Sequence, residues 1–341
     1  MTPTERKDLD SSGRTTTLDA DGSELELALA VRCRTVVAEG VVELILVEPE
    51  GRELPEWSPG SHIDLLIPST RADQTFTRQY SLCGLQADRH AYRIAVLLEP
   101  EGRGGSRAIH EGLGRGDLIH VRGPRNNFPL EQTERYLFVG GGIGITPLMP
   151  MIAQLERRGT EWRLLYGGRS RESMAYVNEL VGFGDRVFIR PQDQFGLLNL
   201  AGFFGEPDER TLIYCCGPAP LLDAAEQLTR SWPARSLRVE RFSAVPLKGG
   251  EVNRPIELTL ARSGVTLNVA ASDSILDTVE RAGVAVLASC REGTCGTCET
   301  RILDGRADHR DSVLSPEEQE DQDAMFICVS RALTPALTLD L

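Results

Sequence analysis

The feature that most constrains this chain is a run of three cysteines near its C-terminal end, CREGTCGTC over 290–298, with a fourth cysteine 30 residues later. This spacing is that of a plant-type [2Fe–2S] cluster, in which a tight loop and one separate segment bring four thiolates to two irons. Gly293 and Gly296 let such a loop wrap closely, because glycine reaches left-handed conformations. A zinc site or buried free thiols are the alternatives, although zinc sites commonly use paired C-x2-C knuckles. The candidate ligands are Cys290, Cys295, Cys298 and Cys328.

Length and charge narrow the class of protein. A chain of 341 residues suggests two or three domains, and its net charge of −13 argues against a nucleic-acid partner. We find no apolar run of bilayer length and no secretory signal, so we expect no membrane partner and a cytoplasmic location. Eight cysteines in such a chain suggest a reducing compartment. Residues 256–341 carry 15 acidic side chains and 7 arginines, which suits either a basic protein partner or solubility alone.

Residues 25–130 contain short β-branched and apolar segments separated by glycine, proline, aspartate or asparagine. Many short strands without long helices between them predict a closed antiparallel β-barrel. The polar stretch before them, residues 1–24, is expected to be a disordered arm. The expected strands are Leu25–Arg32, Val41–Val47, Ile63–Ile67, Tyr80–Cys83, Tyr92–Leu98 and Leu118–Val121.

Two segments of this barrel suit a bound flavin. Arg78 and Tyr80 fall on one face of a strand, where the ring can lie against a flavin and the arginine can meet a phosphate. The sequence GRGGS over 102–106 opens a short helix, and a glycine-rich turn presents N–H groups and a positive dipole end to a phosphate. Each pattern is common by itself, but together, upstream of a nucleotide motif, they predict a flavin phosphate site.

From 131 to 240 strands alternate with helices, which predicts a parallel sheet with ligands at the carboxyl ends of its strands. The sequence GGGIGITP over 140–147 lets pyrophosphate approach the backbone, and its proline suits a first helical turn. A tight turn without a ligand is the alternative. The expected strands are Tyr136–Val139, Trp162–Tyr166, Val187–Arg190 and Thr211–Cys215, and the expected helices are Leu148–Arg158 and Leu221–Arg230.

Two further strand ends could contact a nucleotide. The segment CCGP over 215–218 offers a thiol and a glycine where nicotinamide could approach a flavin, although alone it is more typical of an ordinary strand end. The segment GGRSR over 167–171 lacks an acidic residue for a ribose hydroxyl. Its Arg169 and Ser170 could instead accept a 2′-phosphate.

The rest of the chain has the order of a small β-grasp ferredoxin. A linker over 241–255 precedes a hairpin of Ile256–Ala261 and Thr266–Val269, a helix Ser274–Ala282, the cysteine loop and a final strand Leu337–Leu341. The predicted fold class is therefore multidomain, β and α/β. Its domains are a disordered arm (1–24), a flavin-binding antiparallel β-barrel (25–130), a parallel-sheet NAD(P)-binding α/β domain (131–240), the linker, and a β-grasp [2Fe–2S] ferredoxin domain (256–341).

The motifs RQYSLCG, GRGGS, GGGIGITP, YCCGP and CREGTCGTC…ADHRD…CVSRA resemble the phthalate dioxygenase reductase and vanillate O-demethylase reductase family. The resemblance covers the chain from about residue 25, in the family's order and spacing. It implies an FMN barrel, a pyridine-nucleotide domain and a plant-type ferredoxin. Such proteins pass electrons from NAD(P)H through FMN and a [2Fe–2S] cluster to a separate Rieske-type oxygenase, which here would hydroxylate or demethylate a small aromatic substrate.

The resemblance also implies individual site residues, and no catalytic acid or base among them. Gln79 departs from the threonine that is common in the family. The resemblance favours NADH, whereas Arg169 and Ser170 predict appreciable NADPH use. We expect the cofactors to be bound by Arg78, Gln79, Tyr80, Ser81, Ala95, Val96, Leu97, Gly104, Gly105, Ser106, Gly142, Gly144, Thr146, Arg169, Ser170, Cys216, Gly217 and Phe242.

Two other functions are left open by the residues. A ferredoxin-type redox carrier or sensor with degenerate upstream domains is one, but the intact glycines of the nucleotide loop argue against it. A self-sufficient enzyme with its own oxygenase site is the other. No Rieske C-x-H…C-x2-H pair occurs in the sequence, and its five histidines are scattered singly, unlike a facial triad.

Overall fold

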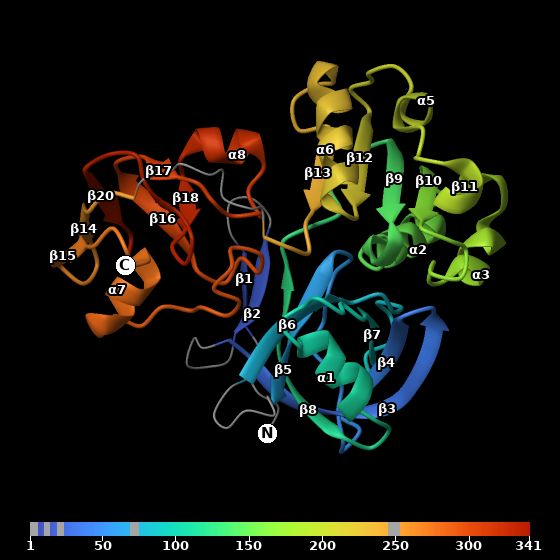
Figure 1. The fold of residues 1–341 in the computed structure, drawn as a ribbon, viewed down its shortest axis with the longest axis horizontal. Helices are drawn as coiled ribbons and strands as arrows, with labels where there is room; N and C mark the ends of the chain where they lie inside the picture. The colour runs from blue at the N-terminus through green and yellow to red at the C-terminus, as the bar shows by residue number, and fades with distance from the viewer. Residues whose placement is uncertain (1–5, 10–13, 19–23, 69–74, 245–252) are drawn as a thin grey trace. The chain divides into compact units, whose positions relative to one another are not determined.

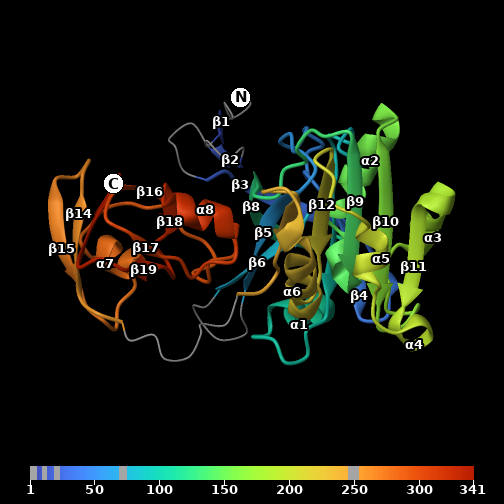
Figure 2. The ribbon, with the colours of Figure 1, turned by 90° about the horizontal axis from the view of Figure 1, so that it is seen from above.

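The computed structural model describes residues 6–9, 14–18, 24–68, 75–244 and 253–341. The chain divides into two compact units, Met1–Glu240 and Arg241–Leu341. The first unit contains a barrel and a helix-flanked sheet, and the second contains a small mixed sheet (Figures 1 and 2). Within the described ranges, no helix has the length and apolar character needed to cross a membrane.

The barrel is an eight-stranded antiparallel sheet in the order β1-β2-β8-β3-β4-β7, with β5 paired to β8 and β6 paired to β5. The N–H of Cys83, just after β6, donates to the carbonyl of Arg93 in β7 and brings the two ends together. Alternate apolar side chains point inward and form a buried core. The strands are β1 (Arg6–Leu9), β2 (Thr15–Leu18), β3 (Glu26–Ala38), β4 (Val41–Val47), β5 (Ser61–Pro68), β6 (Thr75–Ser81), β7 (Tyr92–Leu97) and β8 (Leu118–Asn126).

The expectation that residues 1–24 form a disordered arm is wrong for part of that stretch. Strand β2 pairs with β8, where Thr15 lies opposite Asn126. Thr17 is buried, and its hydroxyl donates to the carbonyl of Pro124 at 2.9 Å. Three consecutive threonines favour a strand because their side chains are β-branched, a local signal that the polar composition of the arm concealed.

Four barrel strands extend beyond their predicted ranges: β3 continues to Ala38, β5 gains a residue or two at each end, and β6 and β8 gain polar segments. The predicted strand Tyr80–Cys83 covers only the end of β6, which begins at Thr75. Strand β8 continues past Val121 to Asn126. Its last residues are polar, yet Arg125 and Asn126 are buried and hydrogen-bonded. Hydrophobic patterning missed these segments because buried polar partners stabilise them.

The nucleotide sheet has five parallel strands in the order β11-β10-β9-β12-β13. Helix α2 (Leu148–Arg158) has the predicted range and packs on one face, while α5 (Leu200–Phe204) and α6 (Ala219–Leu228) pack on the other. The strands are β9 (Arg135–Gly141), β10 (Glu161–Gly168), β11 (Val187–Pro191), β12 (Thr211–Cys216) and β13 (Leu237–Glu240). The shorter helices are η1 (Gly142–Ile145), α3 (Val177–Leu180), η2 (Val181–Arg186), α4 (Gln192–Phe195) and η3 (Thr229–Ser231).

The barrel and the nucleotide sheet share one hydrophobic core. Val41, Cys83 and Ala95 of the barrel belong to the same buried cluster as Phe138 and Tyr166 of the sheet. Strand β7 contacts both η1 of the sheet and α1 (Gly105–Gly112) of the barrel. The carboxyl edge of the sheet is therefore held next to β7.

The second unit is built on a mixed sheet in the order β15-β14-β20-β16-β18, with β14 and β20 parallel. Helix α7 (Ile275–Arg281) is capped by Ser274, whose hydroxyl accepts the N–H of Asp277 at 2.9 Å. The other elements are β14 (Ile256–Leu260), β15 (Val265–Val269), β16 (Glu299–Asp304), β17 (Ala307–Asp308), α8 (Pro316–Asp321), β18 (Ala324–Phe326), β19 (Arg331–Ala332) and β20 (Ala336–Leu339).

Candidate cofactor sites

The predicted flavin segments meet at the beginning of α1. A Cβ atom added to Gly105 would lie 2.9 Å from both Cγ and Nε of Arg78, so the arginine lies directly against the first residue of the helix. Gly104, the N-cap, has φ 95 and contributes no side-chain cap, which leaves helix N–H groups available at this end. An arginine beside free helix N–H groups forms a cradle for a phosphate.

The remaining flavin-segment residues are held by the barrel. Ser81 and Ala95 are buried, and Tyr80 is half-buried. Ser106 accepts the N–H of Glu99 at 3.0 Å, so its hydroxyl fixes the loop that precedes α1. Val96 points into the barrel core, whereas Leu97 packs toward the nucleotide sheet.

The flavin strand β6 is supported by a buried polar group, Asp64, that sequence patterns did not reveal. Gln79 donates to Asp64 at 3.0 Å, and Asp64 is completely buried in an ion pair with Arg125. Arg125 is also paired with Glu24. The only sequence signal was a single aspartate within the apolar strand SHIDLLIP, and its partners are too distant in sequence to be recognised.

The nucleotide glycine loop lies at the carboxyl ends of β9 and β12, as predicted for a parallel sheet. A Cβ atom on Gly144 would lie 2.2 Å from the carbonyl oxygen of Cys216, so this glycine is required by the close approach of η1 to β12. Gly142 has φ 56 and no atom within 4 Å of its Cβ position, which leaves its backbone open to a ligand. Thr146 is buried and donates to the carbonyl of Ile143 at 3.0 Å.

Cys216 and Gly217 lie beside this loop. The Cys216 thiol is fully buried, and burial raises its pKa well above the ordinary value, so it remains protonated. Its neighbour in β13 is Glu240, which the sequence did not single out. One Glu240 carboxylate oxygen is enclosed and has no hydrogen-bond partner among the described residues, and burial raises the pKa of this group to about 8.

The remaining predicted site residues, Arg169 and Ser170 on one hand and Phe242 on the other, lie in different parts of the structure. Arg169 is exposed and Ser170 half-buried just after β10, and Arg190 lies beside them at the end of β11. The Arg190 guanidinium stacks on the half-exposed ring of Phe195 at 4.9 Å. Phe242 is 47% exposed and belongs to the second unit, so its proximity to a flavin stays a prediction.

The four predicted ligand cysteines occur as two pairs. The backbone N–H of Cys290 lies 3.5 Å from the Cys295 sulfur, and a hydrogen bond between the two side chains lowers the pKa of Cys290. Glu292 adds a backbone N–H at 3.3 Å. The side chains of Cys298 and Cys328 also form a hydrogen bond, which raises the pKa of Cys298.

The loop between these cysteines has the conformation expected of it. Gly293 and Gly296 have φ of 69 and 78, and a Cβ on Gly293 would lie 2.6 Å from Val329. No group of three or more His, Cys, Asp or Glu suited to a single metal ion occurs in the described part of the chain. A two-and-two arrangement instead fits a cluster of two irons with two thiolates each.

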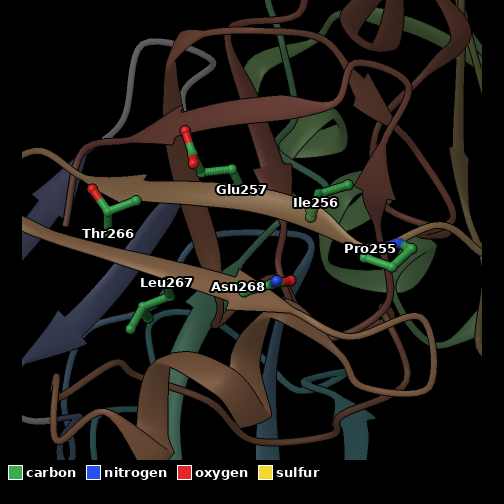
Figure 3. Close-up of a pocket in the computed structure, with 6 residues that line it drawn as sticks. All are labelled: Pro255, Ile256, Glu257, Thr266, Leu267 and Asn268. Atoms are coloured by element: carbon green, nitrogen blue, oxygen red, sulfur yellow. The ribbon is translucent and has the colours of Figure 1, made fainter.

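Two surface grooves contain no predicted site residue. One, of about 340 Å³, lies on the β14–β15 hairpin and is lined by Pro255, Ile256, Glu257, Thr266, Leu267 and Asn268 (Figure 3). The other, of about 380 Å³, lies at the amino-terminal edge of the nucleotide sheet.

An anion cradle on a barrel, a glycine loop on a parallel sheet and a paired-cysteine loop define a flavin- and iron–sulfur-containing reductase. The 2Fe-2S iron-sulfur cluster binding domain family matches residues 258–333. The phenoxybenzoate dioxygenase subunit beta of Ectopseudomonas oleovorans is 40% identical over 95% of this chain and 100% of its own length. The solved structure of phthalate dioxygenase reductase, described as transferring electrons from pyridine nucleotides to [2Fe–2S], is 34% identical and covers 93% of this chain and 98% of its own, with a TM-score of 0.66.

The chain belongs to the family of phthalate dioxygenase reductase and vanillate O-demethylase reductase. It is an NAD(P)H-dependent iron–sulfur flavoprotein oxidoreductase with FMN and a [2Fe–2S] cluster, and a reductase component of an oxygenase system. A type IV self-sufficient cytochrome P450 monooxygenase also matches, with 39% identity and a TM-score of 0.85 over 93% of this chain. This chain spans only 41% of that longer protein.

Proposed function

We propose that this protein carries electrons from NAD(P)H through FMN and its [2Fe–2S] cluster to a separate Rieske-type oxygenase that acts on a small aromatic substrate. The flavin, when bound, accepts two electrons from the nucleotide and releases them singly to the cluster. The relatives named for phthalate, vanillate and toluene-4-sulfonate support an aromatic substrate, although one relative is named for carnitine.

The observation that carries this proposal is the contact of β7 with both candidate sites of the first unit. Strand β7 touches α1, whose first residue lies against Arg78, and it touches η1 of the nucleotide loop. An FMN phosphate in the Arg78–Gly105 cradle would therefore place its ring system toward the edge where Gly142 and Cys216 can receive nicotinamide. The paired cysteines of the second unit supply the exit for single electrons.

In this proposal, each predicted residue has a role. FMN is held by Arg78, Gln79, Tyr80, Ser81, Ala95, Val96, Leu97, Gly104, Gly105 and Ser106. The nucleotide is held by Gly142, Gly144, Thr146, Arg169, Ser170, Cys216 and Gly217, while Phe242 lies near the flavin. The iron ligands are Cys290, Cys295, Cys298 and Cys328.

We also propose that NADH is the preferred donor and that NADPH is tolerated. The exposed Arg169, with Ser170 beside it, could pair with a 2′-phosphate, and no acidic side chain occurs in GGRSR to repel one. Steady-state kinetics with both nucleotides measures this preference. A value of kcat/KM for NADPH more than about a thousandfold below that for NADH, roughly 4 kcal/mol, would contradict tolerance.

The partner assignment is tested by mixing the reduced protein anaerobically with two electron acceptors, a purified Rieske oxygenase and ferricyanide. The protein reduced by NADH should reduce a Rieske oxygenase rapidly, as followed by the loss of the oxidised Rieske absorbance. The Cys295→Ser variant should not. Failure of the wild-type protein to reduce any Rieske oxygenase, while it reduces ferricyanide, would contradict the Rieske partner.

A haem monooxygenase is the second candidate partner, and a specific observation favours it. The reductase-like part of the self-sufficient cytochrome P450 is as similar to this chain as the dioxygenase reductases are. Replacing the Rieske acceptor by a ferric P450 haem protein under carbon monoxide gives a direct assay. A faster formation of the ferrous carbonyl complex than of reduced Rieske protein would favour this candidate.

A further inference from the structure

Arg93 of the barrel makes three directional contacts, two of which reach the nucleotide domain. Its Nε lies 2.5 Å from Glu43 of β4, within the barrel. Its two terminal nitrogens lie 2.6 and 3.1 Å from the two carboxylate oxygens of Glu179 in α3. Its guanidinium carbon lies 4.4 Å from the centre of the Tyr176 ring. Arg93 is therefore fixed in the barrel by Glu43. It contacts the nucleotide domain through a bidentate ion pair with Glu179 and a cation–π contact with Tyr176.

The Tyr176 and Glu179 side of this contact has a fixed backbone conformation. Tyr176 is 5% exposed and is the N-cap of α3, with φ 62, a strained conformation for a residue with a Cβ atom. The left-handed turn at Tyr176 presents its ring and the Glu179 carboxylate to the same arginine. A strained conformation persists only where its surroundings determine it, and Arg93 is one of those surroundings.

The contact leads directly to both candidate cofactor sites. On the barrel side, the Arg93 carbonyl accepts the N–H of Cys83, two residues beyond Ser81 of the flavin strand, and the Cys83 sulfur lies 3.7 Å from the Tyr176 hydroxyl. On the sheet side, the Tyr166 hydroxyl lies 3.1 Å from the carbonyls of Ala175 and Gly142. One chain of contacts therefore runs from the flavin strand to the nucleotide loop.

We propose that Arg93, acting with Tyr176 and Glu179, is a positioning clamp that sets the nucleotide sheet against the flavin barrel at the separation that hydride transfer requires. Hydride transfer breaks the C4–H bond of the reduced nicotinamide and forms a bond at flavin N5, so the reacting atoms must approach to about 3–3.5 Å. The apolar core shared by the two halves is non-directional and does not define their angle. The two contacts of Arg93 with Glu179 and Tyr176 do define it, and the pair with Glu43 fixes the arginine on the barrel. This clamp rests on the proposed assignment of the flavin and nucleotide sites.

The test is the anaerobic stopped-flow reduction of the flavin by NADH in the holoprotein, with Arg93→Met. This change keeps an unbranched side chain that reaches about as far as the arginine Nε, and it removes the guanidinium with its charge and hydrogen bonds. The limiting rate of flavin reduction should fall at least about tenfold, since an error of about 1 Å in position can cost about a hundredfold in rate. The dissociation constant for NADH should change less than about threefold. Arg93→Lys, which keeps the charge, should recover part of the rate.

Arg186→Met is the matched control. Arg186 stacks on Trp162 at 4.6 Å and makes a bidentate pair with Glu156 at 2.6 and 2.9 Å, the same two kinds of contact. All three of these residues belong to the nucleotide half, so the control loses comparable stability without loosening the junction. Its rate of flavin reduction should stay within about twofold of the wild-type rate.

A normal limiting rate in folded, FMN-loaded Arg93→Met would overturn the clamp, as would an equal slowing in Arg186→Met. If Arg93→Met does not fold, Glu179→Gln replaces it, because Glu179 is half-exposed and its loss leaves Arg93 paired with Glu43. Glu179→Gln should slow flavin reduction about threefold or more, and an unchanged rate would overturn the proposal. Wild-type protein whose flavin NADH cannot reduce would instead refute the proposed function itself.

Discussion

At the residue scale, the [2Fe–2S] cluster should depend on each of its four ligands, which occur as the Cys290–Cys295 and Cys298–Cys328 pairs. Cys295→Ser removes one thiolate from one iron, so we expect loss of the cluster with retention of FMN. Iron and acid-labile sulfide analysis should show both close to zero, while NADH-dependent ferricyanide reduction stays near the wild-type rate because that dye accepts electrons from the flavin. Cys33→Ser is the control, since Cys33 is exposed and lies outside the loop. Stoichiometric zinc in the wild-type protein would contradict the cluster assignment.

His62 makes the stability of the barrel depend on pH. Burial lowers the pKa of His62 from 6.5 to about 4, and its Nε2 has no hydrogen-bond partner among the described residues. Between about pH 4 and 6.5 the unfolded state therefore binds more protons, so the free energy of unfolding falls as the pH is lowered through this range, by up to about 3 kcal/mol. Urea unfolding at pH 7 and pH 4.5 measures the fall. The fall should be smaller in His62→Gln, and equal falls in both proteins would contradict the assignment.

At the scale of a single element, helix α1 contains two glycines, Gly105 and Gly112, that serve as a test position and its control. Alanine at Gly105 would displace Arg78, because the new Cβ would lie 2.9 Å from that side chain, and we expect FMN affinity to fall about tenfold, roughly 1.4 kcal/mol. Gly112→Ala places its Cβ where no atom lies within 4 Å, so it should leave FMN affinity unchanged and stabilise the helix slightly. Fluorescence titration of the apoprotein with FMN compares the two. Equal affinities in both variants would contradict the phosphate cradle.

At the scale of the whole molecule, the acidic surface of the second unit could affect the rate of electron transfer to the partner oxygenase. Glu318 belongs to the capping box of α8, so a clean test leaves it intact and uses the exposed Glu320 and Asp323. If α8 docks on a basic surface, the double variant Glu320→Gln/Asp323→Asn should slow transfer to the oxygenase several-fold at low salt and flatten its salt dependence.

The control for this docking test is Glu257→Gln/Asp304→Asn, which removes the same charge from β14 and β16. It should leave the transfer rate near the wild-type value, and ferricyanide reduction should be unchanged in both double variants. Equal transfer rates in the two variants across a salt titration would assign the acidic run to solubility alone.

The sequence alone predicted the features that depend on short-range patterns. The ranges of β4 and α2 and the left-handed glycines of the cysteine loop follow from local periodicity and from backbone preferences of single residues. The alternation of strands and helices over 131–240 followed in the same way, because its longer elements signal themselves within about ten residues. The motif spacing then identified the family, which the comparisons confirm.

Only the tertiary structure determined which distant residues meet. Arg78 and Gly105 are 27 positions apart, and the Arg93 clamp joins β7 to α3 across a longer separation. The threonines of β2 carry a local strand signal, but its pairing with β8 is tertiary, and the polar end of β8 is stable because Asp64 and Arg125 are buried together. Such contacts depend on packing and on burial in a low-dielectric interior, which no local pattern encodes.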